Sequence, residues 1–256
     1  MSNRERSVRT EGIVLRRRDF GEFDRILVIF TKKLGRISGI AKGARKPNSK
    51  ISGHLELFTR SSFLISRGRS LQLITQAETL DSFDHLRGDL GGIGLGSYIV
   101  ELVDAVTTEE GSHLHLYGLL LNTLSALDSG LETSIVVHNF ELKLLELTGF
   151  RPEFFICVEC GDAITEQDQY LSGAMGGVIC PKCVQRLGGG EFRPISARIL
   201  KYLRHFQRSN LEDLLPLKMP SAVNRGMEEA IHYILNHTLE GHLNSPDFIS
   251  RIKNNG

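Results

Sequence analysis

The four cysteines of this chain fall into two C-x-x-C pairs, Cys157 with Cys160 and Cys180 with Cys183, and nineteen residues separate the pairs. Each two-residue spacer can fold into a turn that points both thiolates at one ion, and two such turns complete a tetrahedron. Four thiolates leave no coordination position open for water. The spacing therefore predicts one structural Zn²⁺ per chain and no hydrolytic metal.

Two alternatives explain the cysteine pairs less well. Disulfides are disfavoured in a reducing cytosol. A thioredoxin-type redox motif needs one pair within a βαβ pattern, which the sequence lacks. We therefore expect a zinc ribbon at about residues 154–192, with Gly161 closing the first knuckle and Gly173, Gly176 and Gly177 shaping the hairpin before the second pair.

The N-terminal part of the chain has the pattern of a β-domain. Five runs rich in β-forming residues are separated by Gly, Pro, Asn or charged breaks: GIVLRRR, DRILVIF, GRISGIA, LELFTRSSFLI and SLQLITQA. The second run alternates Ile26, Val28 and Phe30 on one face. Five short strands predict a closed OB-like barrel at residues 1–82, although an SH3-like barrel fits nearly as well.

From about residue 83 the apolar residues repeat at helical spacing. Five such stripes lie at 95–106, 117–127, 137–147, 199–206 and 227–235. They predict an all-α helical domain at residues 83–256 that carries the ribbon, so the expected fold class is α+β. The glycine-rich run at 90–96 lacks the spacing of a phosphate loop, and we expect a flexible entry to the first helix with small residues for close packing.

Charge is distributed unevenly along the chain. Residues 1–70 hold seventeen Lys and Arg against six acidic residues, whereas the remainder holds fourteen against twenty-four. This asymmetry indicates that the barrel meets a polyanion, although a basic domain docking on an acidic one is an alternative. No apolar run is long enough for a membrane span, and the N-terminus does not read as a secretory signal, so we expect a cytoplasmic protein without membrane contact.

Enzyme motifs are absent from the sequence, and we predict no catalytic residues. A zinc deaminase needs H-x-E and a later P-C-x-x-C. The residues at 54–56 match the first half, but Ile179 rather than proline precedes Cys180. Neither H-E-x-x-H, G-x-S-x-G nor a Walker motif occurs. The prediction is a non-enzymatic protein.

Residues 11–50 contain a G-I-V-L strand, a D-F-G-E-x-D-R-I turn, an L-G-R-I strand and a K-G-A-R-K-P loop, and L-T-G-F-x-P follows at 147–152. With these motifs the chain resembles the RecO family of DNA repair proteins. The resemblance implies an OB-fold that binds single- and double-stranded DNA and anneals complementary strands at the nucleoid. It also implies RecR as a partner in loading the RecA recombinase onto DNA coated by single-strand-binding protein (SSB).

The candidate DNA-binding residues are cations of the barrel. They are Arg16, Arg17, Lys32, Arg36, Lys42, Arg45, Lys46 and Lys50. The last four lie in a loop at 42–50 that has Gly and Pro but no evident apolar anchor, so we expect an exposed, mobile loop that grips phosphates. A merely solvated loop is the alternative. An RNA-binding adaptor is the other function considered, but it would need stacking aromatics, and we expect Phe30, Phe58 and Phe63 to fill the core.

A second basic element lies in the acidic half. Arg198, Lys201, Arg204 and Arg208 recur every three or four residues, on one face of a helix expected to begin near Ser196. The resemblance implies that the helical domain binds the acidic, hydrophobic C-terminal tail of SSB, and this face with Arg151 could form the cationic rim of the site. A solvated helix face, or a salt-bridge seam with Glu141 or Glu146, remains open.

Overall fold

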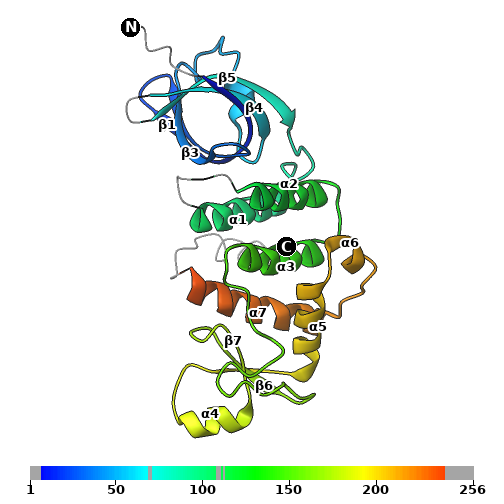
Figure 1. The fold of residues 1–256 in the computed structure, drawn as a ribbon. Helices are drawn as coiled ribbons and strands as arrows, with labels where there is room; N and C mark the ends of the chain where they lie inside the picture. The colour runs from blue at the N-terminus through cyan, green and yellow to red at the C-terminus, as the bar shows by residue number, and fades with distance from the viewer. Residues whose placement is uncertain (1–6, 69–70, 108–110, 112, 240–256) are drawn as a thin grey trace. The chain divides into compact units, whose positions relative to one another are not determined.

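The computed structural model describes residues 7–68, 71–107, 111 and 113–239, which form a barrel followed by helices and a small sheet (Figure 1). The described residues divide into two compact units between residues 129 and 130. The predicted α+β fold class, a five-stranded barrel followed by helices with a four-cysteine cluster, is confirmed.

The barrel is a closed sheet with the strand order β1-β2-β3-β5-β4. Its strands are β1 (Val8–Phe20), β2 (Asp24–Thr31), β3 (Gly35–Ala41), β4 (Arg60–Ser66) and β5 (Gln72–Asp81). Neighbouring strands run antiparallel except β3 and β5, which run parallel. Inside the barrel is an apolar core that includes Val14, Leu27, Ile29, Phe63 and Ile74. Full closure leaves no open sheet edge, so the barrel is a stable base for its surface residues.

The fourth predicted strand is too long. Its first residue, Leu55, is the last of a 3₁₀ turn, Ser52–Leu55, and Phe58 then adopts a positive φ of 67° before β4 begins at Arg60. A residue in the left-handed region cannot continue a strand. The side chain of Phe58 is buried nonetheless, as are those of Phe30 and Phe63, as predicted. Ser70, the first residue of the fifth run, lies outside the described residues.

Two helices, α1 (Leu90–Val106) and α2 (Leu114–Asp128), belong to the same compact unit as the barrel. Phe30 is outside the barrel's inner core and lies 6.0 Å, centroid to centroid, from the ring of Tyr117 on α2. Strand β2 is therefore buried on both faces, which explains why its apolar residues do not simply alternate with polar ones.

The glycine-rich run is helical rather than a flexible entry. Helix α1 begins at Leu90, and the Asp89 side chain caps it by accepting a hydrogen bond from the Gly92 N–H at 2.7 Å. The close packing expected of the small residues is present, because a Cβ on Gly96 would lie only 3.0 Å from the Phe58 ring. The cap and this contact explain why a glycine-rich segment folds as a helix here.

The second unit consists of helices and a small sheet. Its helices are α3 (Thr133–Leu147), α4 (Pro181–Leu187), α5 (Ala197–Arg208), α6 (Leu211–Leu214) and α7 (Ser221–Thr238). The sheet has the order β7-β6-β8, from β6 (Gln169–Ser172), β7 (Gly177–Ile179) and β8 (Arg193–Ile195). The five predicted helical stripes coincide with α1, α2, α3, α5 and α7. No helix in the described part of the chain has the length and apolarity needed to cross a bilayer.

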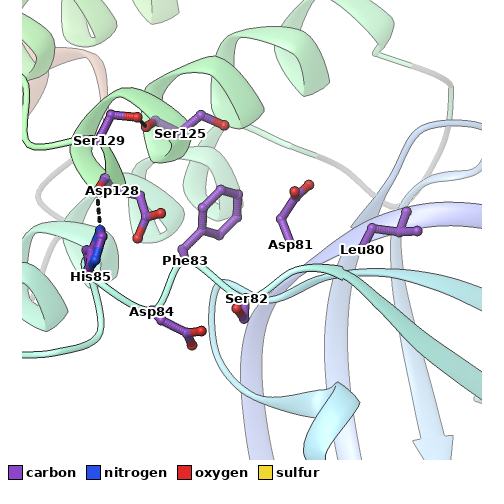
Figure 2. A pocket seen from close by; sticks show the side chains of 9 residues that line it. All are labelled: Leu80, Asp81, Ser82, Phe83, Asp84, His85, Ser125, Asp128 and Ser129. Atoms are coloured by element: carbon purple, nitrogen blue, oxygen red, sulfur yellow. Dashed lines mark hydrogen bonds between the residues drawn. The ribbon is translucent and has the colours of Figure 1, made fainter.

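A recess of about 460 Å³ opens where the chain leaves the barrel (Figure 2). It is lined by residues 80–85 together with Ser125, Asp128 and Ser129. Asp81 pairs with Arg60 at 2.7 Å, and Asp128 accepts the Leu86 N–H at 2.9 Å. Asp81 thus joins β5 to β4, and Asp128 joins α2 to the segment before α1. The acidic lining does not suit a polyanion.

Candidate metal centre and nucleic-acid interface

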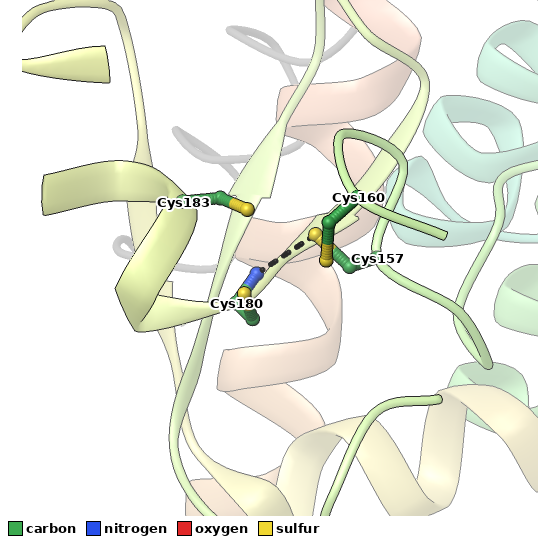
Figure 3. A group of neighbouring side chains, drawn as sticks. All are labelled: Cys157, Cys160, Cys180 and Cys183. Atoms are coloured by element: carbon green, nitrogen blue, oxygen red, sulfur yellow. Dashed lines mark hydrogen bonds between the residues drawn. The ribbon is translucent and has the colours of Figure 1, made fainter. Parts of the chain in front are cut away.

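The four cysteines converge, with all their sulfur atoms within 4.8 Å of one another (Figure 3). A tetrahedral ion with metal–sulfur bonds of about 2.3 Å needs sulfur–sulfur separations of about 3.8 Å. The cluster therefore has the donors and spacing of a four-thiolate metal site. Within the described residues it is the only group of three or more potential ligand side chains close enough to hold a metal ion.

Each C-x-x-C pair is shaped by its backbone. In the first, the Gly161 N–H donates to the carbonyl of Cys157 at 2.8 Å, and Gly161 has a φ of 79° that suits glycine. In the second, Cys180 precedes helix α4, whose first turn carries Cys183 inward. The hairpin between the pairs turns through Gly173 and Gly176, as predicted from the glycine positions.

The thiols differ in their tendency to ionise. Burial opposes ionisation of Cys157, but backbone N–H groups, that of Cys180 first, donate to its sulfur and lower its pKa to about 6. Burial and the neighbouring thiols raise the pKa of Cys183 to about 12. Four thiolates cannot be crowded together without a compensating cation. The buried core around the cysteines is small and consists of Cys157, Ile179 and Cys183.

Two of the predicted DNA-binding residues, Arg16 and Arg36, contact a carboxylate that no motif in the sequence indicates. Asp104 of α1 has a fully buried side chain and forms ion pairs with both arginines. Its contact with the Arg36 Nε is 2.5 Å long. The two ion pairs neutralise positive charge on the barrel and link β1 and β3 to α1, so these arginines also have a structural role.

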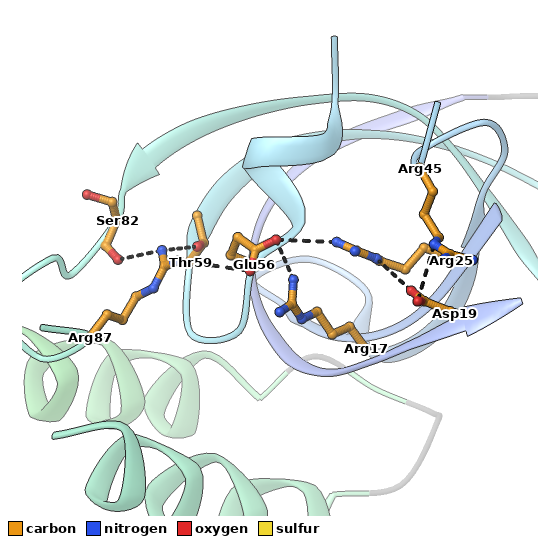
Figure 4. Close-up of polar contacts among 8 residues, drawn as sticks. All are labelled: Arg17, Asp19, Arg25, Arg45, Glu56, Thr59, Ser82 and Arg87. Carbon is orange, nitrogen blue, oxygen red and sulfur yellow. Dashed lines mark hydrogen bonds and ion pairs between the residues drawn. The ribbon is translucent and has the colours of Figure 1, made fainter. Parts of the chain in front are cut away.

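Further cations of the barrel form a chain of ion pairs (Figure 4). Glu56 pairs with Arg17 and Arg25, and Asp19 lies 3.4 Å from the Nε of Arg25 and 3.2 Å from that of Arg45. Lys32 lies 4.0 Å from Glu11. The pairs of Arg17, Lys32 and Arg45 are partly exposed and contribute little stability, so a phosphate could replace the carboxylate at each, whereas the Arg25 side chain is mostly buried.

The loop at 42–50 is anchored, which contradicts the expectation of a loop without an apolar anchor. Ala44 is completely buried in the barrel core. The N–H of Arg45 donates to the carbonyl of Phe23 at 2.9 Å, and the N–H of Gly43 donates to the carboxylate of Asp24 at 2.8 Å. The loop is thus fastened to the β1–β2 turn, while the side chains of Lys42, Lys46 and Lys50 are on exposed positions.

On α5, the four basic residues are not equivalent. The helix begins beside Ser196, as predicted, and the Ser196 side chain caps it, while Arg198 and Lys201 are exposed. The Nε of Arg204 donates to the carbonyl of Phe154 at 2.7 Å. Arg208 stacks on the ring of Phe155 at 3.8 Å. Arg151 contacts other residues: its guanidinium lies 3.6 Å from the Glu146 carboxylate and 3.5 Å from the side-chain oxygen of Gln207.

A buried polar cluster in the second unit was missed from the sequence. Glu141 of α3 is completely buried and receives contacts from His138 Nδ1 at 3.2 Å and from His232 Nε2 at 3.4 Å. The Nε2 of His138 in turn lies 2.8 Å from Asn224 Oδ1. Burial would raise the pKa of Glu141, but the hydrogen bonds from both histidines lower it to about 2. Only the packing of α3 against α7 brings these residues together.

Fold and site together define a class of protein in which a small cationic β-barrel precedes a helical part with a four-cysteine centre. Models of the families "Recombination protein O N terminal" and "Recombination protein O C terminal" match residues 1–83 and 87–247. The chain belongs to the RecO family of DNA repair proteins.

Relatives over the whole length agree with this assignment. The chain is 38% identical over 252 residues to a DNA repair protein RecO of Roseiflexus sp., covering 98% of this chain and 87% of that protein. It is 35% identical to a DNA repair protein RecO of Alkaliphilus metalliredigens, covering 95% and 96% of the two chains. The family models meet between residues 83 and 87, near the predicted boundary at 82/83, whereas the compact units divide at 129/130, so the domain division stays a prediction.

Proposed function

We propose that the chain is a non-enzymatic recombination mediator that acts in the cytoplasm at the nucleoid. It binds single- and double-stranded DNA, anneals complementary strands and, with RecR, helps to load RecA onto SSB-coated DNA. Membership of a DNA repair family supports this proposal. A cluster of four thiolates also supports a non-enzymatic role, because such a site has no open position for chemistry.

The observation that carries DNA binding is the anchored loop at 42–50. Its exposed lysines are held at a defined place beside the β1–β2 turn by the buried Ala44 and by two backbone N–H groups. An anchored cationic loop can contact phosphates without a large ordering cost. Arg16, Arg17, Lys32, Arg36 and Arg45 would extend the interface by exchanging their carboxylate partners for phosphates.

The salt dependence of binding tests this interface. Replacing Lys42 and Lys50 with Gln removes two phosphate contacts, and we expect the log–log salt slope on single-stranded DNA to flatten by about 1.4 units. Lys218→Gln with Arg225→Gln, on exposed positions of the second unit, is the matched control. An unchanged slope in the loop variant would contradict the proposal. Parallel titrations of single strands, duplex and RNA of one length separate the DNA-repair role from the RNA-adaptor alternative.

We further propose that the cysteine cluster holds one structural Zn²⁺, as ligands Cys157, Cys160, Cys180 and Cys183. The convergence of four sulfur atoms supports a soft, tetrahedral ion. Arg186 supports it too, because its guanidinium lies 3.7 Å from the Cys183 sulfur and pairs with Glu159 of the first knuckle at 3.0 Å. Elemental analysis of purified protein should find one zinc per chain.

A second candidate role, binding of the SSB tail, is favoured by the surroundings of α5. Phe150 and Ile156 are large apolar residues with exposed fractions of 56% and 44%, and Arg208 stacks on the adjacent Phe155. An acidic tail with apolar side chains needs this combination of aromatic surface and cations. Because Arg204 also holds the Phe154 carbonyl, the exposed Arg198 and Lys201 are the cleaner residues to test.

The test is a titration of a fluorescent SSB tail peptide. Replacing Arg198 and Lys201 with Glu should weaken peptide binding about tenfold or more, since like charges then face the tail. Melting and binding to bare DNA should not change. The control is Lys218→Glu with Arg225→Glu in the same unit. Equal peptide affinity in both variants would place the tail site elsewhere.

A further inference from the structure

The turn between β1 and β2 exposes two aromatic side chains. Phe20 ends β1 and Phe23 precedes β2, with exposed fractions of 50% and 37%. Isolated exposed apolar residues are ordinary on protein surfaces. Two exposed phenylalanines within a four-residue stretch at the tip of a hairpin are less common, and neither contributes to the barrel core.

The cationic loop is fastened to this same tip. The carbonyl of Phe23 accepts the N–H of Arg45 at 2.9 Å, and the carbonyl of Glu22 accepts its guanidinium at 3.3 Å. The Nζ of Lys46 lies 5.7 Å from the centre of the Phe23 ring. Three carboxylates, those of Asp19, Glu22 and Asp24, also lie in or beside the turn, but the four cations of the loop and the neighbouring Arg18 outnumber them.

We propose that Phe20 and Phe23 form a base-stacking platform that takes unpaired nucleobases while the cations of the 42–50 loop hold the adjoining phosphates. Aromatic faces beside cations are the combination that binds single strands without regard to sequence. A duplex offers no open base face except at its ends. The platform therefore favours single strands and rests on the proposed DNA binding. Stacking occupies the face of a base and leaves its pairing edge available to a complementary strand.

The absence of tryptophan from the sequence makes a direct probe available. In a Phe20→Trp variant the only indole lies at the tip, and a base that stacks on it should quench its fluorescence. We expect quenching with a single strand, and little with a blunt duplex or with an abasic strand that carries the same number of phosphates. Phe150→Trp, which puts the only indole on an exposed site of the second unit, is the control for quenching away from the platform.

Affinity provides the second readout. Phe20→Ser with Phe23→Ser should weaken single-strand binding about tenfold, with duplex and abasic-strand affinities unchanged. The wild type should prefer the natural strand to the abasic one, and this preference should disappear in the variant. Phe20→Tyr with Phe23→Tyr should retain it, because the ring faces remain.

The outcomes separate this inference from the proposed function. If the wild type binds neither strand nor duplex, DNA binding and the platform both fail. If the wild type binds natural and abasic strands equally, and the double serine variant matches it, DNA binding stands and the platform is overturned. Loss of duplex binding in the serine variant, to the same degree as single-strand binding, also overturns it, since that result indicates a damaged loop instead of a lost stacking surface.

Discussion

Among the residues that the structure describes, each compact unit buries one carboxylate, and the two units neutralise it in different ways. Asp104 in the first unit pairs with Arg16 and Arg36, whereas Glu141 in the second is held by His138 and His232. Arginine is charged at every accessible pH, whereas histidine changes charge near neutrality. The barrel unit thus neutralises its buried carboxylate with two permanent cations, whereas the helical unit holds its buried carboxylate with imidazole side chains.

The units also differ in the size of their cores. The barrel closes around an inner core of ten buried residues, whereas the ribbon has only Cys157, Ile179 and Cys183 fully buried in its cluster. A core of that size offsets little of the conformational entropy of its strands, so we expect the proposed metal to contribute to the stability of the ribbon. The barrel needs none.

Removing the metal should have the largest effect and separate the two units most clearly. Cys160→Ser should abolish metal binding and unfold the ribbon, because structural zinc in small domains contributes roughly 10 kcal/mol of apparent free energy. Elemental analysis and thermal melting measure this, and bare-DNA affinity should be close to wild type because the barrel is intact. An unchanged melting profile after chelation would contradict the expectation that the ribbon, unlike the barrel, needs a metal for its stability.

The second-largest expected effect is a loss of stability of the helical unit in acid. The pKa of Glu141 is about 2 in the folded protein against an ordinary 4.5, so it contributes its stability above pH 4.5 and loses it as the pH falls toward 2. The loss is on the order of 3 kcal/mol. Chemical unfolding followed by circular dichroism from pH 6 to 3 should show most of this loss in the wild type and a smaller one in Glu141→Gln. Glu146→Gln, on the same helix but with a partly exposed side chain, should behave like the wild type.

Breaking the arginine-held anchor should cost less. Asp104→Asn leaves Arg16 and Arg36 without their carboxylate, but the Arg16 side chain is 64% exposed and can turn to water, so we expect a loss of about 2 kcal/mol. Urea unfolding measures it, with Glu78→Gln on the exposed face of β5 as the control. The same variant should bind single-stranded DNA more tightly, because Asp104 no longer neutralises the charge of these two arginines. Weaker DNA binding by a folded Asp104→Asn protein would argue against that exchange.

The smallest effect concerns the contact between α1 and the barrel. Gly96→Ala places a methyl 3.0 Å from the Phe58 ring, and we expect a loss of about 1 kcal/mol. Gly118→Ala on α2 meets nothing within 4 Å and should gain about 0.5–1 kcal/mol from helix propensity. Opposite signs in thermal melts would establish that Gly96 is required for close packing. A gain at both positions would show that Phe58 adapts.

Much of the architecture follows from local pattern. The helices, the cysteine cluster and the hairpin each depend on a pattern that extends over a few residues, so they could be predicted from the sequence. The start of the fourth strand could not be predicted, because Phe58, in the turn before it, packs against Gly96, which comes thirty-eight residues later in the chain. The prediction that the 42–50 loop has no apolar anchor was also wrong, because nothing in the sequence around Ala44 indicates that this residue lies in the barrel core.

By itself the sequence determined the α+β fold class, the four-thiolate centre and the concentration of positive charge in the barrel. The tertiary structure alone decided which of those charges have partners. Arg36 and Asp104 are sixty-eight residues apart in the chain, and His138 and Asn224 are eighty-six apart. Composition records that such groups exist, but an ion pair requires two side chains within about 4 Å, and only the packing of helix on barrel and of helix on helix sets that distance.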